Sequence, residues 1–166
     1  MPLTLAYLAT TAISTLEWQD PNRENYLSSR MSYTHQLILG RKFSKSFSLQ
    51  LMPTVVHRNL TKTVKEKNDV YALGAALRQK LTMRLSVNVE YFHLLPDQVA
   101  ENNFNSLSVG FDIETGGHVF QLHFTNSTSM IERGFITETV GDWGKGDIHF
   151  GFNVSRVFTI RDKRTE

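Results

Sequence analysis

The amino-acid sequence predicts an all-β fold: an antiparallel up-and-down transmembrane β-barrel with eight strands in this chain. Three observations predict it. Apolar and polar residues alternate with a period of two, the links between alternating segments are short and long in turn, and every lysine lies outside the segment interiors. At 166 residues the chain forms one domain, which we place at residues 1–160, followed by a charged tail at 161–166.

The first four segments span about residues 3–14, 27–43, 47–58 and 69–79. Segment 3–14 lacks the basic start and the cleavage site of a secretory signal, and its alternation is typical of a strand. The third segment shows the pattern well, with an apolar row of Phe47, Leu49, Leu51 and Val55. Residues between them are mostly polar, so each face of the strand has its own chemistry.

The last four segments span about residues 84–91, 106–114, 118–126 and 147–155. Their apolar rows include Val87 and Val89, Val109 and Phe111, and Phe150 and Phe152. A two-residue loop, Gly116-Gly117, joins the sixth and seventh segments; with φ > 0 at both glycines it pairs Thr115 with His118. In this register Phe111 faces Leu122, and apolar residues meet apolar residues along both strands.

The links alternate in length. Those after the second, fourth and sixth segments are short, whereas Thr15–Glu24, Asn59–Lys67, Leu95–Asn103 and Ser127–Gly146 are long. Outer-membrane barrels have short periplasmic turns and long external loops, so both ends of the chain are expected in the periplasm. Strands fill well over half the chain, which is typical of a closed barrel without free edges.

The charge pattern indicates which face meets lipid. We assign the polar rows to a lumen with a charge-paired network, made by Arg30, Arg58, Arg78, Arg84, Glu90, Asp112, Glu114, His123 and His149. Tyrosines near the long-loop ends and phenylalanines near the opposite ends predict two aromatic girdles. The alternation alone also fits a soluble lipocalin-like ligand-binding barrel, whose two faces are exchanged.

The sequence contains few residue patterns that indicate catalysis or metal binding. It has no cysteine, no clustered basic face for nucleic acid and no apolar run of the roughly 18–20 residues that a spanning helix needs. His123, His149 and Asp112 share a predicted face without metal-ligand spacing, and Ser106 near His123 has no nucleophile-elbow signature. We therefore expect no catalytic site, metal or cofactor.

Among the loops, 127–147 is the longest, and we expect it either to recognise a ligand or to be solvated.

Several long runs are similar to a known family: YTHQLILGRKF from Tyr33, KNDVYALGA from Lys67, GFDIETGGHVFQLHFTNS from Gly110 and DIHFGFNVSRVFTI from Asp147. They resemble uncharacterised bacterial outer-membrane β-barrel proteins, classed as a domain of unknown function. The resemblance implies that this chain is the C-terminal portion of a larger outer-membrane barrel, with membrane lipid and the barrel insertion machinery as partners. Charged residues in the long loops 59–69 and 127–147 add lipopolysaccharide or another external ligand as a further expected partner. Phe158 resembles the aromatic residue on which such barrels commonly end.

These observations predict an integral outer-membrane barrel that is not an enzyme. Eight strands alone enclose only enough space for side chains, so we expect passive transport or permeation only as part of a larger barrel. The alternative in the membrane is a non-conducting structural or ligand-binding surface barrel.

Overall fold

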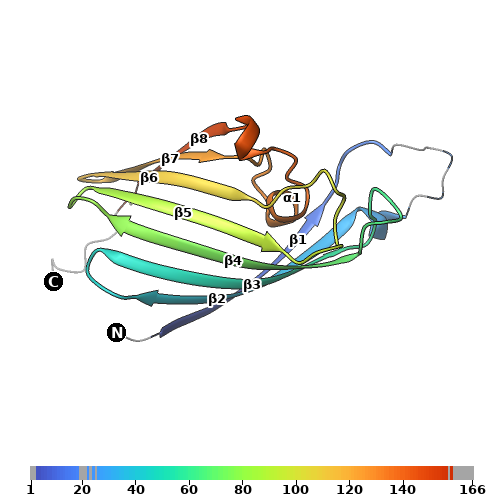
Figure 1. Cartoon of the computed structure of the whole chain (residues 1–166), viewed down its shortest axis with the longest axis horizontal. Helices are drawn as coiled ribbons and strands as arrows, with labels where there is room; N and C mark the ends of the chain where they lie inside the picture. Colours follow the sequence, from blue (N-terminus) through green and yellow to red (C-terminus); the bar gives the residue numbers. More distant parts are fainter. Residues whose placement is uncertain (1–2, 19–21, 23, 25, 157, 159–166) are drawn as a thin grey trace.

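The computed structural model describes residues 3–18, 22, 24, 26–156 and 158, and it contains one antiparallel sheet of eight strands. The strands are β1 (Leu3–Ile13), β2 (Met31–Lys42), β3 (Phe47–Arg58), β4 (Asp69–Lys80), β5 (Leu85–Leu94), β6 (Leu107–Thr115), β7 (His118–Thr125) and β8 (His149–Arg156). Each strand pairs with the next in sequence, from β1 to β8 (Figure 1). The predicted all-β, up-and-down order of eight strands is confirmed.

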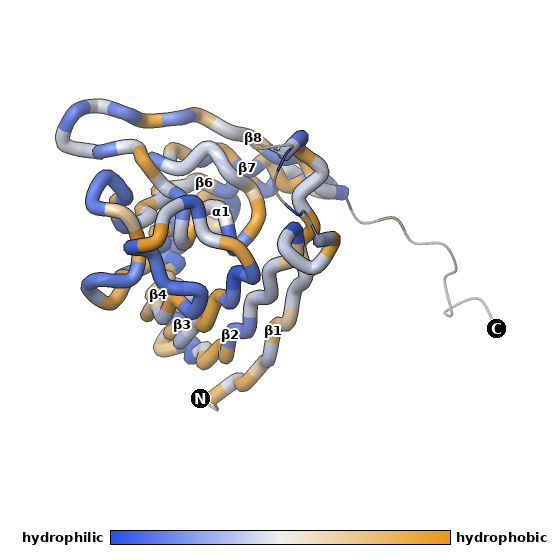
Figure 2. Tube along the Cα trace, turned by 90° about the vertical axis from the view of Figure 1, so that its right-hand side faces the viewer, coloured by the Kyte–Doolittle hydropathy of each residue, from blue (hydrophilic) through white to orange (hydrophobic). Residues whose placement is uncertain are grey.

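The sheet forms an open half-barrel. Within the described residues no ladder joins β1 to β8, and the view along the strands in Figure 2 shows the sheet curving around the short helix α1 (Glu132–Thr137). The expectation that the eight strands close on themselves is therefore wrong. Alternation determines which face each side chain takes, but barrels of many strand numbers share the same alternation, so it does not determine the curvature.

The two ends of the sheet differ in the length of the links between strands, as predicted. The short turns at residues 43–46, 81–84 and 116–117 lie at one end, where β1 begins and β8 ends, and the longer links lie at the other (Figure 1). We call the second end the long-loop end. Among described residues, no helix is long and apolar enough to cross a membrane.

The predicted register of β6 and β7 is confirmed, with Thr115 opposite His118 and Phe111 opposite Leu122. The turn itself differs from the prediction, because only Gly116 of the two glycines has a positive φ, of 48°. Strand limits differ from the predicted limits by a few residues. The largest local difference precedes β2, where residues 27–30 form the 3-10 turn η1 (Leu27–Arg30) instead of extended strand.

The two faces of the sheet differ as the alternation predicts. Outward side chains are apolar and exposed: Leu5 is 64% exposed and Phe152 66%. Toward the long-loop end the same face carries three stacked pairs of rings, Tyr7 with His35, Tyr33 with His57 and Tyr91 with His93. Rings with an apolar body and a polar edge suit the boundary between lipid and headgroups.

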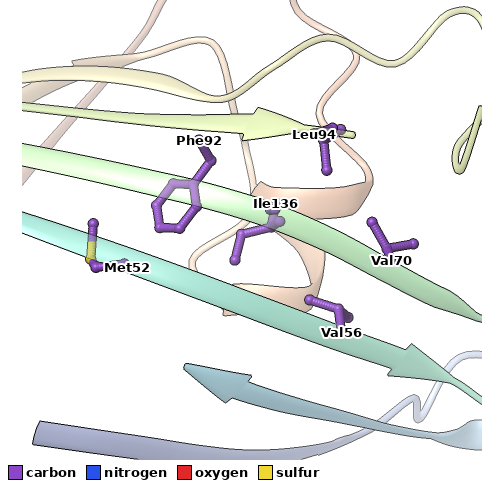
Figure 3. Packing of buried hydrophobic residues seen from close by; sticks show 7 residues of the cluster. Met52, Val56, Val70, Phe92, Leu94 and Ile136 are labelled. Carbon is purple, nitrogen blue, oxygen red and sulfur yellow. The ribbon is translucent and has the colours of Figure 1, made fainter. Parts of the chain in front are cut away.

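The concave face changes character along its length. Near the short turns it is polar, whereas near the long-loop end it carries the buried cluster Met52, Val56, Val70, Ala72, Phe92 and Leu94. Helix α1 covers this cluster and inserts Ile136, which is fully buried, between the side chains of β3, β4 and β5 (Figure 3). The hydrophobic core therefore lies inside the curve of the sheet, at one end.

Candidate functional site

The candidate site is the hollow of the half-barrel, a cavity of about 960 Å³ that reaches across the concave face from β1 to β8. Five of the predicted lumen residues line it: Arg78, Glu90, Asp112, His123 and His149. Small polar residues such as Ser48, Asn88, Ser108 and Gln121 form much of the remaining wall. The hollow is therefore a polar surface on the inside of a sheet whose outside is apolar.

Arg78 is the centre of a charged cluster on this surface. It lies on β4, and its Nη2 atom is 3.3 Å from an Asp112 carboxylate oxygen and 3.2 Å from a Glu114 carboxylate oxygen on β6. Its Nε and Nη2 atoms also donate to the Ser86 hydroxyl on the intervening strand β5, at 3.1 and 3.0 Å. The Gln121 amide from β7 donates to Asp112 at 3.2 Å. Through these ion pairs and hydrogen bonds the cluster connects side chains of four neighbouring strands, β4 to β7.

Glu90 lies further along the hollow on β5, directly opposite Ala76 of β4 and Ser108 of β6. Neither neighbour carries charge, and Glu90 forms no ion pair with any of the described residues. Glu90 therefore places a carboxyl group in the cavity wall next to small side chains.

The two predicted lumen histidines line the cavity near the β8 edge. His123 faces Gly151 across the β7–β8 ladder, and a Cβ atom at residue 151 would lie only 2.3 Å from the His123 Nε2 atom. Glycine at position 151 therefore makes room for the imidazole. His149 pairs with Thr125 at the other end of the same ladder. Within the described part of the chain, no group of three or more His, Asp or Glu side chains is placed to hold a metal ion.

Arg58 lies on the concave face but does not join the cavity wall. Its side chain is 2% exposed and forms an ion pair with Glu66, which is 4% exposed, at 2.9 Å. It also donates to the Lys67 carbonyl oxygen at 2.9 Å, and the Thr63 hydroxyl donates to Glu66 at 3.2 Å. Arg58 therefore holds the β3–β4 loop over the end of its own strand.

Arg30 and Arg84 are not among the residues that line the cavity. Arg30 belongs to η1, donates to the carbonyl oxygens of Ser14 and Leu16, and places its guanidinium 4.1 Å from the centre of the Trp18 ring. Arg84 is exposed in the β4–β5 turn. Both residues continue the alternation of a neighbouring strand in the sequence, but the strands end before reaching them.

The segment between β7 and β8, residues 126–148, departs most from expectation. The prediction for it is an external loop, yet α1 folds into the hollow, and the 3-10 turn η2 (Trp143–Lys145), which has no buried residue, follows it beside the start of β8 (Figure 1). Phe135 packs edge-on against Phe92 of β5, with ring centres 5.4 Å apart. A signal for this placement in the sequence is the group of apolar residues on the otherwise polar rows of β3, β4 and β5, such as Val56, Val70 and Leu94.

Hydrogen bonds fix this inward segment to the surrounding wall. The side-chain amide of Asn126 donates to the carbonyl oxygens of Asn105 and Gly141, and its oxygen accepts from the Leu107 backbone N–H. The Trp143 indole N–H donates to the Leu107 carbonyl oxygen at 3.0 Å. Thr137 and Thr139, both almost fully buried, use their hydroxyls to bond carbonyl oxygens within the segment.

Comparison with known proteins agrees with this architecture. Residues 1–158 match the family described as membrane bound beta barrel domain (DUF5777). No curated protein and no solved structure matches the chain. The soluble lipocalin-like alternative does not fit a membrane-bound family, and the exposed apolar rows of the outer face are the surface that such a family requires. The chain therefore belongs to the DUF5777 family of membrane-bound β-barrel domains.

Proposed function

We propose that this chain is one part of the wall of a larger, non-enzymatic barrel in a bacterial outer membrane, and that this barrel lets small polar solutes permeate passively. The observation that carries the proposal is the open sheet: its inner face is polar and hollow, its outer face is apolar, and both of its edges lack partners within the described residues.

The free edges support a larger ring on energetic grounds. About half of the backbone N–H and C=O groups of an antiparallel edge strand point away from the sheet. In a bilayer each such group without a partner costs several kcal/mol, so an edge as long as the 11 residues of β1 is not tolerated facing lipid. Further strands at both edges satisfy these groups and widen the interior beyond the narrow lumen of eight strands.

The side chains at both edges fit such continuation. Residues 3–13 of β1 contain no charged residue, proline or glycine, and β8 has only Arg156 as a charged residue, at its last position. Strand edges that must stay unpaired usually carry charges, prolines or bulges. Outward Leu5 and Tyr7 on β1, like outward Phe150 and Phe152 on β8, would extend an apolar belt onto the added strands.

The ends of the sheet support the orientation and the partners. Exposed Lys62 and Lys65 in the β3–β4 loop suit the phosphates of lipopolysaccharide at the outer surface. At the opposite end Phe158 is 68% exposed and its ring lies 4.7 Å from the Arg156 guanidinium. An exposed aromatic residue after the last strand suits recognition by the barrel insertion machinery.

The test uses the assembly that contains this chain, purified from outer membranes in mild detergent. A band shift between boiled and unboiled samples on a gel, seen with detergent and absent without it, establishes a folded membrane barrel. Ion conductance in planar bilayers and uptake of small sugars by vesicles then test permeation. A folded assembly that neither conducts nor takes up sugars would overturn the pore and favour a non-conducting surface barrel.

A further inference from the structure

We infer that the inward segment 126–148 is a fixed constriction that sets the upper size of the solutes passing through the barrel. The inference rests on the proposed permeation function. Helix α1 and its flanking turns lie within the curve of the sheet at the long-loop end, on the route from the external side to the hollow (Figures 1 and 2). Any solute entering there must pass beside this segment.

The segment narrows the route because it forms one wall of the cavity. Ser127, Thr128, Ser129, Met130 and Phe135 line the hollow from the segment side, facing wall residues of the sheet. The lining residues are mostly small and hydroxylated, and none of the five is charged. Such a rim admits small polar solutes by size and hydrogen bonding without strong preference for charge.

Burial indicates that the constriction does not move aside. Ile136 and Thr137 have no exposed surface, and the apolar patch beneath α1, including Val56, Val70 and Phe92, is covered by this segment. Lifting α1 would place that patch in the water of the lumen, which is unfavourable in proportion to its apolar area. The patch therefore requires its cover while solutes pass through the barrel.

Contacts to three other parts of the chain hold the segment in place. The Thr10 hydroxyl of β1 donates to Glu132 at 3.4 Å, and Lys62 in the β3–β4 loop lies 3.6 Å from Glu138. From the β5–β6 loop, Asn103 donates to the Thr137 carbonyl oxygen. The Phe104 backbone N–H donates to the Thr139 carbonyl oxygen at 2.8 Å. Attachment on several sides favours a rigid element over a swinging lid.

Two glycines of the segment offer a matched test. A Cβ atom at Gly141 would clash with the backbone carbonyl oxygens of Asn126 and Asp147, at the two ends of the segment itself, so Gly141→Val must shift the backbone that holds α1 in place. A Cβ atom at Gly144 would meet only the Asp142 side chain, at 3.2 Å, so Gly144→Val is the control. We expect Gly141→Val to raise single-channel conductance and to admit larger sugars in vesicle uptake, with Gly144→Val equal to the unaltered protein.

A second pair of variants tests the same inference in the opposite direction without disturbing the fold. Met130 lines the cavity and is 74% exposed, whereas its neighbour Ile131, 49% exposed, is outside the cavity lining. We expect Met130→Trp to lower conductance severalfold and to exclude sugars that the unaltered barrel admits. We expect Ile131→Trp to have little effect on either measurement.

The outcomes separate the two hypotheses. If the unaltered barrel conducts and both pairs of variants leave conductance and the size limit unchanged, the constriction hypothesis is refuted, whereas the permeation hypothesis is supported. If no form of the folded barrel conducts, the pore itself is wrong. If only Gly141→Val conducts, the segment is a complete plug and not a constriction.

The chain contains no cysteine, so Lys62→Cys with Glu138→Cys, bridged by a bifunctional thiol reagent, tests rigidity cleanly. Loss of conductance on bridging would show a moving lid.

Discussion

Val109 lies on the outer face of β6, directly opposite Val89 near the middle of β5 and opposite Phe124 of β7. We therefore expect Val109 to face the hydrocarbon core of the bilayer. Val109→Arg would place a guanidinium in the hydrocarbon, which costs about 2–4 kcal/mol of unfolding free energy at the bilayer midplane. Because about 1.4 kcal/mol is a factor of ten, the unfolding equilibrium should shift by roughly 30- to 700-fold.

The preceding residue is a matched control on the other face. Ser108 lines the cavity and lies directly opposite Glu90, so Ser108→Arg places the new cation at the cavity wall beside an acidic side chain and not in hydrocarbon. We expect a change of about 1 kcal/mol or less, because a solvated ion pair contributes little. A second control repeats the chemical change in water: Val64 in the β3–β4 loop is fully exposed, and Val64→Arg should stay within about 0.5 kcal/mol.

The assay is denaturant unfolding of the barrel in lipid vesicles, followed by tryptophan fluorescence and by the band shift on unboiled gels. Denaturation midpoints for the three variants are compared at equal slope, so that differences report stability. If Val109→Arg and Val64→Arg destabilise the barrel equally, the outer face does not meet lipid and the assignment of the two faces is refuted.

Three further predictions concern the interior. Ile136→Ala removes a fully buried side chain, so the contact of α1 with the sheet should weaken by about 2–5 kcal/mol, measured as faster trypsin cleavage after Arg133. Glu66→Ala leaves the Arg58 guanidinium buried without its ion pair and should cost about 3 kcal/mol in denaturant unfolding, and the double replacement of both by leucine should recover much of that loss. Arg78 is 40% exposed, so Arg78→Gln should change the free energy of unfolding by about 1 kcal/mol or less. Because Asp112 and Glu114 lose their cation, the same variant should shift the reversal potential in salt gradients toward cation selectivity. An unchanged reversal potential would mean that the ion route avoids this cluster.

The candidate site was predictable where it depends on alternation. The alternation assigns five residues to the inward rows of regular strands, and all five line the cavity: Arg78, Glu90, Asp112, His123 and His149. The clustering of Arg78 with Asp112 and Glu114 depends on the stagger between β4, β5 and β6, which a single strand does not encode. Arg30 and Arg84 continue the alternation past the strand ends, so the pattern alone does not show that the cavity wall stops short of them.

The sequence by itself determined the all-β class, the eight strands, their order and the face that each side chain takes. These features follow from local physics: a period of two, turn residues such as Gly116, and cross-strand pairs that match only in one register. The tertiary structure alone decided that the sheet stays open and that residues 126–148 fold inward. The inward fold depends on contacts between residues far apart in the chain, above all the burial of Ile136 against three strands. Apolar residues on the inward rows of the strands indicate that a cover is needed, but they do not indicate which segment supplies it.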